Sequence, residues 1–72
     1  MTREELLDLM LESEPISVRC MRCLRAAEVV TYRDLVKHHR SDMLKFRNFG
    51  KKSLMELDEL LESKGLSWGM EV

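Results

Sequence analysis

The sequence has few residues that break helices and few that build disulfide scaffolds. One proline and three glycines among 72 residues are too few for a β-sandwich of many short strands. Only Cys20 and Cys23 could pair, and their spacing on a helix suits neither a local disulfide nor a secreted disulfide-rich domain. No apolar run approaches the roughly 18 residues of a membrane span, and residues 1–5 lack the basic-then-apolar order of a signal peptide. We therefore expect a soluble, intracellular protein with reduced thiols.

The length and the remaining composition predict one compact helical domain. A protein of 72 residues is too short for two domains, because proteins divide at roughly 100–200 residues per domain. A hydrophobic fraction of 44% beside 35% charged residues is too apolar for a disordered tail. We expect an all-α fold, a compact bundle of about four helices plus a short N-terminal helix.

The formal net charge of −1 hides an uneven distribution along the sequence. Residues 1–14 carry −4, residues 15–54 carry +7 and residues 55–72 carry −4. The middle segment holds ten basic residues against three acidic ones. A positively charged surface attracts anionic partners. The alternative interpretation is a charged face that is only solvated by water, which would have the same composition.

Capping residues and apolar spacing predict two helices in the first part of the sequence. Residues 2–11 begin with a capping-box pattern and continue with helical apolar spacing, so we expect a short helix there. Pro15 interrupts the pattern, and Ser17 can cap a second helix that runs to about Ala27. We expect the second helix to bury the side chains of Val18, Met21 and Leu24.

Two short helices are predicted in the middle of the sequence. Thr31 is followed three residues later by Asp34, which signals a helix start, and Ser41 with Asp42 opens a further helical turn. The apolar residues that these short helices carry are Leu35, Val36, Met43 and Leu44.

A long helix is predicted near the C-terminus. Gly50 belongs to a tight turn, and a helix with a leucine stripe follows over about residues 51–63. Gly65 stands where a left-handed C-cap belongs, and Trp68 is expected to cover the core. The leucines expected to be buried are Leu54, Leu57, Leu60 and Leu61.

Basic residues occupy the starts of two predicted helices, where acidic residues are normally favoured. Unpaired backbone N–H groups stabilise a negative charge at a helix N-terminus by about 0.3–1 kcal/mol. Here Arg19 and Arg22 lie in the first turns of the second helix, and Lys51 and Lys52 directly follow Gly50. A helix start with added positive charge is a candidate phosphate site. Two such starts predict a two-point clamp on an anion, and exposed solubilising charge is the alternative interpretation.

The residue types at these starts suit a nucleic-acid backbone. Gly50 permits an anion to approach the main chain closely, Ser53 can add a hydroxyl donor and Lys52 supplies a point charge. The planar fork of Arg19 can enter a narrow groove and meet base-edge acceptors or phosphate.

Several motifs, taken in order, resemble the carboxy-terminal domain of the bacterial RNA polymerase alpha subunit. The most specific are the strings NFGKKSL from Asn48 and GLSWGM from Gly65, behind an SVR that ends at Arg19. The resemblance covers about residues 14–70. It implies a linker-derived helix over residues 1–13, a DNA-binding helical domain over 14–70 and a tail at 71–72.

This resemblance also implies a fold and a function. The fold would be a helix bundle of helix-hairpin-helix, SAM-like character, joined to the polymerase by a flexible linker. The domain would bind the minor groove of A·T-rich upstream promoter DNA and contact transcription activators and sigma factor. It would be non-catalytic, monomeric in isolation, cytoplasmic and nucleoid-associated, and it would reach the other polymerase subunits through the missing N-terminal domain.

The resemblance assigns roles to individual residues of this protein. Arg19 matches the arginine that enters the minor groove, and Gly50, Lys52 and Ser53 match the turn and helix start that hold phosphates. Three further residues match positions that shape or support the same surface: Cys23, Asn48 and Glu56.

The sequence departs from the family pattern in two places. Arg22 stands where family members often carry asparagine, so we count it in the DNA-binding surface and expect more phosphate attraction with less preference for A·T-rich sequence. Ser13 and Pro15 stand where acids would face sigma factor, and Glu12 and Glu14 lie beside those positions but out of register.

Other functions are less well supported by the same residues. Cys20, Cys23, His38 and His39 suggest zinc, but the adjacent histidines make a tetrahedral centre hard to close, so we expect no metal, a small apolar role for Cys23 and exposed histidines. The lysines after Gly50 lack the upstream glycine and strand of a P-loop, and no catalytic constellation is present, so we expect no enzyme and no cofactor. A helical protein-interaction adaptor without DNA binding remains the alternative.

Overall fold

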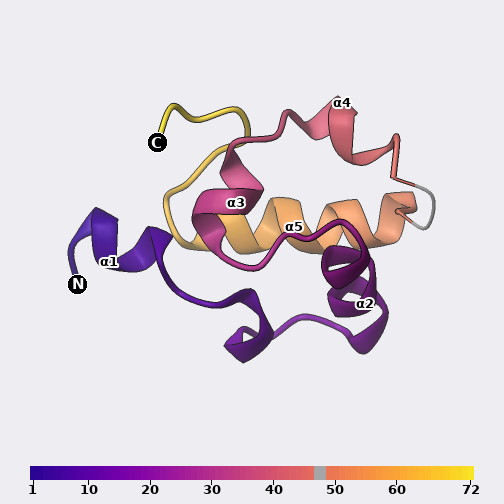
Figure 1. Ribbon diagram of the computed structural model, residues 1–72, viewed down its shortest axis with the longest axis horizontal. Coiled ribbons are helices and arrows are strands. Elements are labelled where there is room, and N and C mark those ends of the chain that lie inside the picture. The colour runs from indigo at the N-terminus through magenta and orange to yellow at the C-terminus, as the bar shows by residue number, and fades with distance from the viewer. Residues whose placement is uncertain (47–48) are drawn as a thin grey trace.

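The computed structural model describes residues 1–46 and 49–72, and it consists of short helices arranged around one longer helix (Figure 1). Within those residues there is no β-strand, and an isolated bridge pairs Met10 with Thr31. The expected all-α fold is confirmed. None of the described helices has the length and apolar character needed to cross a membrane. The helices are α1 (Arg3–Leu7), the 3₁₀ helix η1 (Leu11–Ser13), α2 (Val18–Ala26), α3 (Tyr32–Val36), α4 (Arg40–Met43) and α5 (Lys51–Ser63).

Helix α5 crosses the middle of the molecule and supplies one wall of the hydrophobic core (Figure 1). Its four stripe leucines are all buried, as their spacing predicts. Leu7 of α1 and Leu11 of η1 are buried in the same core, so residues 1–13 pack as part of this unit. Other fully buried side chains come from the remaining helices: Cys20, Leu24, Tyr32, Leu35, Val36 and Met43.

The first helix is shorter than its apolar spacing suggests. It has the expected capping box at Thr2, but it ends at Leu7. The segment that follows forms backbone hydrogen bonds with a distant segment, and the Leu11 N–H donates to the Val30 carbonyl at 2.8 Å. The predicted helix is therefore wrong beyond Leu7, because tertiary backbone hydrogen bonds replace those of a continuing helix.

Helix α2 has the expected cap but a different buried face. The Ser17 hydroxyl accepts a hydrogen bond from the Cys20 N–H at 3.1 Å, which confirms the cap. Leu24 is buried as predicted and Met21 is half-buried, but Val18 is 68% exposed and Cys20 is buried in the core. The prediction for Val18 is wrong because contacts with α5, described below, turn the Cys20 side of α2 inward.

The two short helices begin close to the predicted positions. Thr31 caps α3 in a capping box, as predicted. Helix α4 begins at Arg40, one residue before Ser41, because Asp42 accepts a hydrogen bond from the His39 N–H at 3.2 Å and so moves the helix start upstream.

The C-terminal end of α5 is closed by a Schellman motif. Gly65 has a φ of 69°, the left-handed conformation predicted for it. The Leu66 N–H donates to the Leu61 carbonyl at 2.9 Å, and the Leu66 side chain is buried against the last turn.

The segment after this motif is attached to α5 by an acidic side chain. Asp58 accepts a hydrogen bond from Nε1 of Trp68 at 2.8 Å and pairs with Nη2 of Arg40 at 2.9 Å. The hydrogen bonds from Arg40 are the main reason that the pKa of Asp58 is lowered. Trp68 packs half-buried against the core, which confirms its predicted covering role.

The variant Leu57→Ala is expected to lower the free energy of unfolding by about 2–5 kcal/mol, because it leaves a cavity where a fully buried side chain was. Urea unfolding followed by circular dichroism measures the change. Met55→Ala on the same helix is the control, since Met55 is 56% exposed, and it should change stability by less than about 1 kcal/mol. Equal losses in the two variants would contradict the buried face assigned to α5.

Candidate nucleic-acid interface

Two helix starts that are distant in the sequence lie side by side in the structure. The Glu56 carboxylate on α5 accepts two hydrogen bonds from Ser17, the cap of α2: one from its N–H at 2.7 Å and one from its hydroxyl at 2.8 Å. Ser17 directly precedes α2, and Glu56 lies in the second turn of α5. These bonds hold the start of α2 against the second turn of α5, which brings the two helix starts close together, as a two-point clamp requires.

A buried cysteine adds a second contact between the same helices. The Cys20 thiol donates to the Ser53 carbonyl, with 3.8 Å between sulfur and oxygen. Burial raises the pKa of Cys20 to about 12, with the negative charge of Glu56 as a further cause. The thiol is therefore protonated at neutral pH, and Cys20 serves as a packing group at the helix junction.

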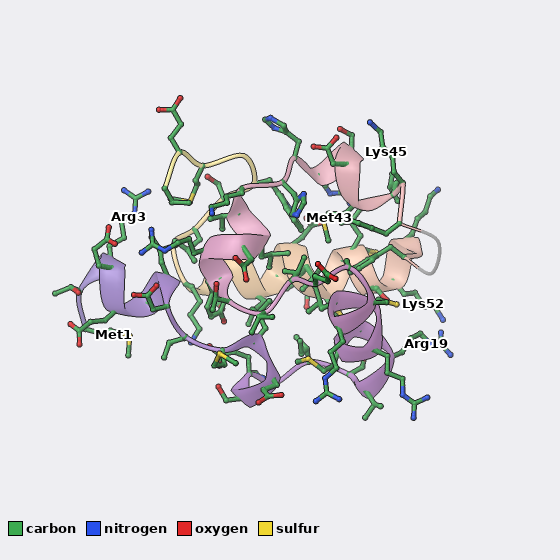
Figure 2. The ribbon with its side chains drawn as sticks, viewed as in Figure 1. Met1, Arg3, Arg19, Met43, Lys45 and Lys52 are labelled. Carbon is green, nitrogen blue, oxygen red and sulfur yellow. The ribbon has the colours of Figure 1, made fainter. Side chains whose placement is uncertain are left out.

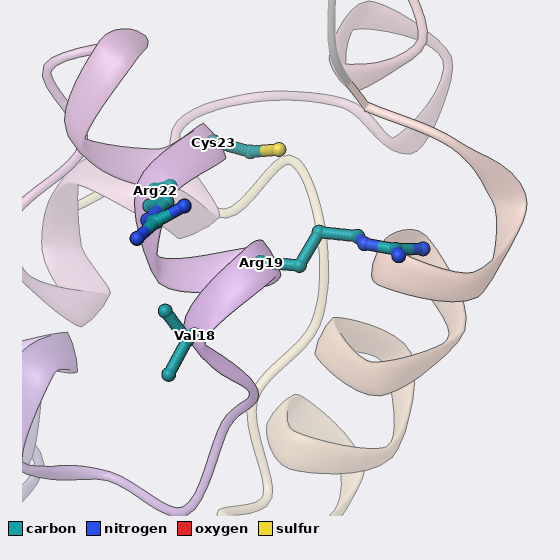
Figure 3. Close-up of a pocket in the computed structure, with 4 residues that line it drawn as sticks. All are labelled: Val18, Arg19, Arg22 and Cys23. Carbon is teal, nitrogen blue, oxygen red and sulfur yellow. The ribbon is translucent and has the colours of Figure 1, made fainter.

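Three basic side chains stand at the exposed edge of this junction: Arg19, Lys51 and Lys52. The first turns of α2 and α5 contain no acidic residue. Arg19 extends from α2 toward the start of α5 (Figure 3), and Arg19 and Lys52 lie at the same end of the molecule (Figure 2). None of the three forms an ion pair with the described residues. Their positive charges are thus not neutralised by those residues.

A surface hollow lies on α2 beside this edge. It has a volume of about 590 Å³ and is lined by Val18, Arg19, Arg22 and Cys23 (Figure 3). Of these residues Cys23 is buried, while the two arginines are exposed. The hollow therefore combines apolar lining from Val18 and Cys23 with two guanidinium groups, an arrangement that suits a flat or anionic ligand.

The start of α5 is open to solvent, and among residues 1–46 and 49–72 no side chain caps it. Gly50 has no side chain that could cap the helix, and the first backbone bond of the helix runs from the Leu54 N–H to the Gly50 carbonyl. The φ of Gly50 is −99°, a value that any residue adopts, and an added Cβ would meet nothing within 4 Å. Glycine is therefore not required by the local backbone, and it leaves the N–H groups of the first turn uncovered for an anion.

The structure exposes four of the predicted site residues and buries two. Arg19, Arg22, Gly50 and Lys52 are exposed at the edge described above. Cys23 and Ser53 are buried, and Ser53 is only 3% exposed, so its hydroxyl lies beneath the surface. The Glu56 carboxylate is bonded to Ser17, which suits a supporting role. Asn48 lies outside the described residues.

The cysteines and histidines that suggested zinc are not gathered into a site. Within residues 1–46 and 49–72, no three His, Cys, Asp or Glu side chains are arranged to bind a metal ion. Cys20 and Cys23 are buried in α2, and His39 is exposed. His38 is half-buried, with its ring edge-on to Phe46 at 5.7 Å between centroids, so the prediction that both histidines are exposed is wrong for His38.

Sequence reasoning alone missed the bond between Ser17 and Glu56. The two residues are 39 positions apart, and Ser17 was recognised only as a local cap. The one signal was that Glu56 occupies a position matched by the family resemblance, which gave no partner for it.

Comparisons with known proteins agree with the resemblance. The family model that describes the C-terminal domain of the alpha chain of bacterial RNA polymerase matches residues 2–63. The DNA-directed RNA polymerase subunit alpha of Bacteroides fragilis is 54% identical to this protein over 68 residues, that of Flavobacterium psychrophilum 53% and that of Salinibacter ruber 50%. Each alignment includes 94% of the present sequence and 21% of the relative. The present sequence thus spans about a fifth of the length of the curated relatives that it matches.

The variant Glu56→Ala is expected to release the start of α2 from α5. Loss of two hydrogen bonds to a charged acceptor should lower the free energy of unfolding by about 1–2 kcal/mol. Amide hydrogen exchange at Cys20 should also become faster. Exchange in α3 should change only as much as the lower overall stability of the domain requires. Glu59→Ala, an exposed acid on the same helix, is the control. Unchanged exchange at Cys20 would show that the bonds to Ser17 do not position α2.

Proposed function

Since this protein belongs to the family of C-terminal domains of the bacterial RNA polymerase alpha subunit, we propose that it binds the minor groove of A·T-rich DNA upstream of promoters. The observation that carries this proposal is the position of the Arg19 side chain beside the uncapped start of α5. A planar guanidinium fits a narrow, strongly negative groove, and a helix N-terminus binds phosphate. The two features together provide one contact inside the groove and one on the adjacent backbone.

Each exposed site residue has a distinct role in this proposal. Arg19 enters the minor groove and reads its width and acceptors. Lys52 and the N–H groups after Gly50 bind phosphate, which fixes the position of the domain without reading sequence. Arg22 adds a further cation beside Arg19. Supporting roles fall to Glu56 and the two buried residues Cys23 and Ser53, and Asn48 stays a predicted contact.

The proposal includes contacts with transcription activators or sigma factor. The segment implied to face sigma has no acid at positions 13 and 15. Its neighbouring acids are engaged within the domain: Glu12 pairs with Arg25 at 3.2 Å, and Glu14 accepts a hydrogen bond from the Tyr32 hydroxyl at 2.7 Å. We therefore expect a contact with sigma through this segment to be weak in this protein.

We further propose that the domain contributes no catalytic group and acts as a monomer in isolation. Nucleotide polymerisation would then belong to the full assembly, which the domain would join through the rest of the alpha subunit. The expected location is the bacterial cytoplasm, at the nucleoid.

A protein-interaction adaptor is the alternative function. An adaptor would account for the exposed charges. It would not explain why the start of α5 lacks a capping side chain from the described residues, or why Gly50 stands there although the backbone does not require glycine. DNA binding accounts for both features, because phosphate supplies the missing partner of the N–H groups.

Titration of a fluorescent A·T-rich duplex at two salt concentrations tests the proposal. With about four phosphate or groove contacts, affinity should fall on the order of 100-fold between about 50 and 200 mM salt.

Arg19→Ala should abolish detectable binding with unchanged circular dichroism, and Lys52→Ala should weaken binding evenly across sequences. Lys64→Ala, a change of the same kind far from this edge along α5, is the control. Unchanged binding in Arg19→Ala would overturn the site assignment.

The variant Arg22→Asn tests the role of the additional cation. We expect weaker binding to all duplexes but a larger ratio of affinities for A·T-rich over G·C-rich DNA, because a charge adds phosphate attraction without base information. Competition between the two duplexes measures this ratio. An identical ratio in the variant and the original protein would refute the proposed effect of Arg22.

A further inference from the structure

A second face of α2 borders an open groove. Two cavities of about 330 and 220 Å³ share Glu12, Met21 and Arg25 in their walls, so they adjoin each other beside η1 and α2, and we call the two together the groove. The remaining residues that line this groove are Ile16, Val18, Arg22, Val29 and Val30.

Five of the eight residues that line the groove are apolar, and the other three are charged. Val29 is buried in it, Ile16 and Met21 are half-buried, and Val18 and Val30 remain 68% and 45% exposed. Exposed apolar surface that is contiguous and has a polar rim is typical of protein-binding sites. Methionine at the centre of such a groove can adapt its shape to different partners.

One face of α2 borders the groove, and a neighbouring face carries Arg19 at the edge proposed to bind DNA. Val18, Met21, Arg22 and Arg25 recur at i, i+3, i+4 and i+7 and so share one face of the helix. Arg19 precedes Arg22 by three residues and extends toward α5, on a different side of α2 from Val18 (Figure 3). Arg22 lines both the groove and the hollow beside Arg19, so it stands at the boundary between the two surfaces.

The charges of the groove restrict its partner. Arg22 has no ion pair within the described residues, and Arg25 pairs with Glu12 at 3.2 Å. Both members of that pair are exposed, so the pair contributes about 0–1 kcal/mol and a carboxylate from a partner can replace Glu12. The arginines on the α2 side of the groove therefore suit acidic side chains of a partner, while the apolar residues of the groove suit apolar side chains of the same partner.

We propose that this groove docks an amphipathic helix of a regulatory protein, with apolar side chains against Met21 and Val30 and carboxylates facing Arg22 and Arg25. The arrangement is the helix-in-groove form of recognition. The proposal deepens the regulatory part of the proposed function, on which it rests for the kind of partner. The groove adjoins the surface proposed to bind DNA, and the two surfaces share Arg22.

A synthetic helical peptide and the 72-residue protein provide the test. The peptide carries leucines at i, i+3, i+4 and i+7 and glutamates along one edge, and a second peptide carries lysines in place of the glutamates. In amide chemical-shift titrations we expect the glutamate peptide to perturb Met21, Arg25, Val29 and Val30. The lysine peptide should bind at least about tenfold more weakly, because like charges then face each other.

Variants separate this proposal from the proposal of DNA binding. Arg25→Glu, a change at an exposed residue, should reverse the preference so that the lysine peptide binds more tightly. Arg19→Ala should lose DNA binding and keep peptide binding. The groove proposal is overturned if the glutamate peptide does not bind at millimolar concentration, if both peptides bind equally, or if the shifts fall outside the groove. None of these results bears on the duplex titration.

Discussion

The carboxylate of Glu56 determines how α2 lies on α5. Its two hydrogen bonds to Ser17 are charge-assisted, and they reach the cap of α2, where the direction of the helix is set. With the cap fixed, Cys20 faces inward and contacts the Ser53 carbonyl, while Val18 turns outward. The positions of the groove and of the basic edge formed by Arg19, Lys51 and Lys52 both depend on this one orientation.

The two helix starts at this junction are completed in different ways. Helix α2 is capped by Ser17, whose hydroxyl accepts from the Cys20 N–H and donates to Glu56. Helix α5 begins after Gly50 without a side-chain cap from the part of the protein that the structure describes, and two lysines stand in its first turn. A cap at this position contributes about 0.5–2 kcal/mol, so the open start sacrifices stability. Departures of this kind from local rules are expected where a protein binds a ligand.

The small size of the domain makes α2 serve several surfaces at once. Leu24 and Cys20 face the core, Arg19 stands at the edge proposed to bind DNA, and Met21 and Arg25 line the groove. Arg22 lies where the last two surfaces meet. A partner in the groove and a duplex at the edge would therefore both attract the same guanidinium, which offers a direct electrostatic connection between regulation and DNA binding.

The sequence by itself determined the features that depend on near neighbours along the backbone. The caps at Thr31 and Gly65 and the leucine stripe of α5 follow from spacings of three to four residues, which local backbone geometry converts directly into structure. Only the tertiary structure decided that α1 ends at Leu7, that Val18 is exposed and that Glu56 bonds to Ser17. Those outcomes depend on which distant segments meet, and the energies of such contacts exceed the small local preferences that a pattern of residues expresses.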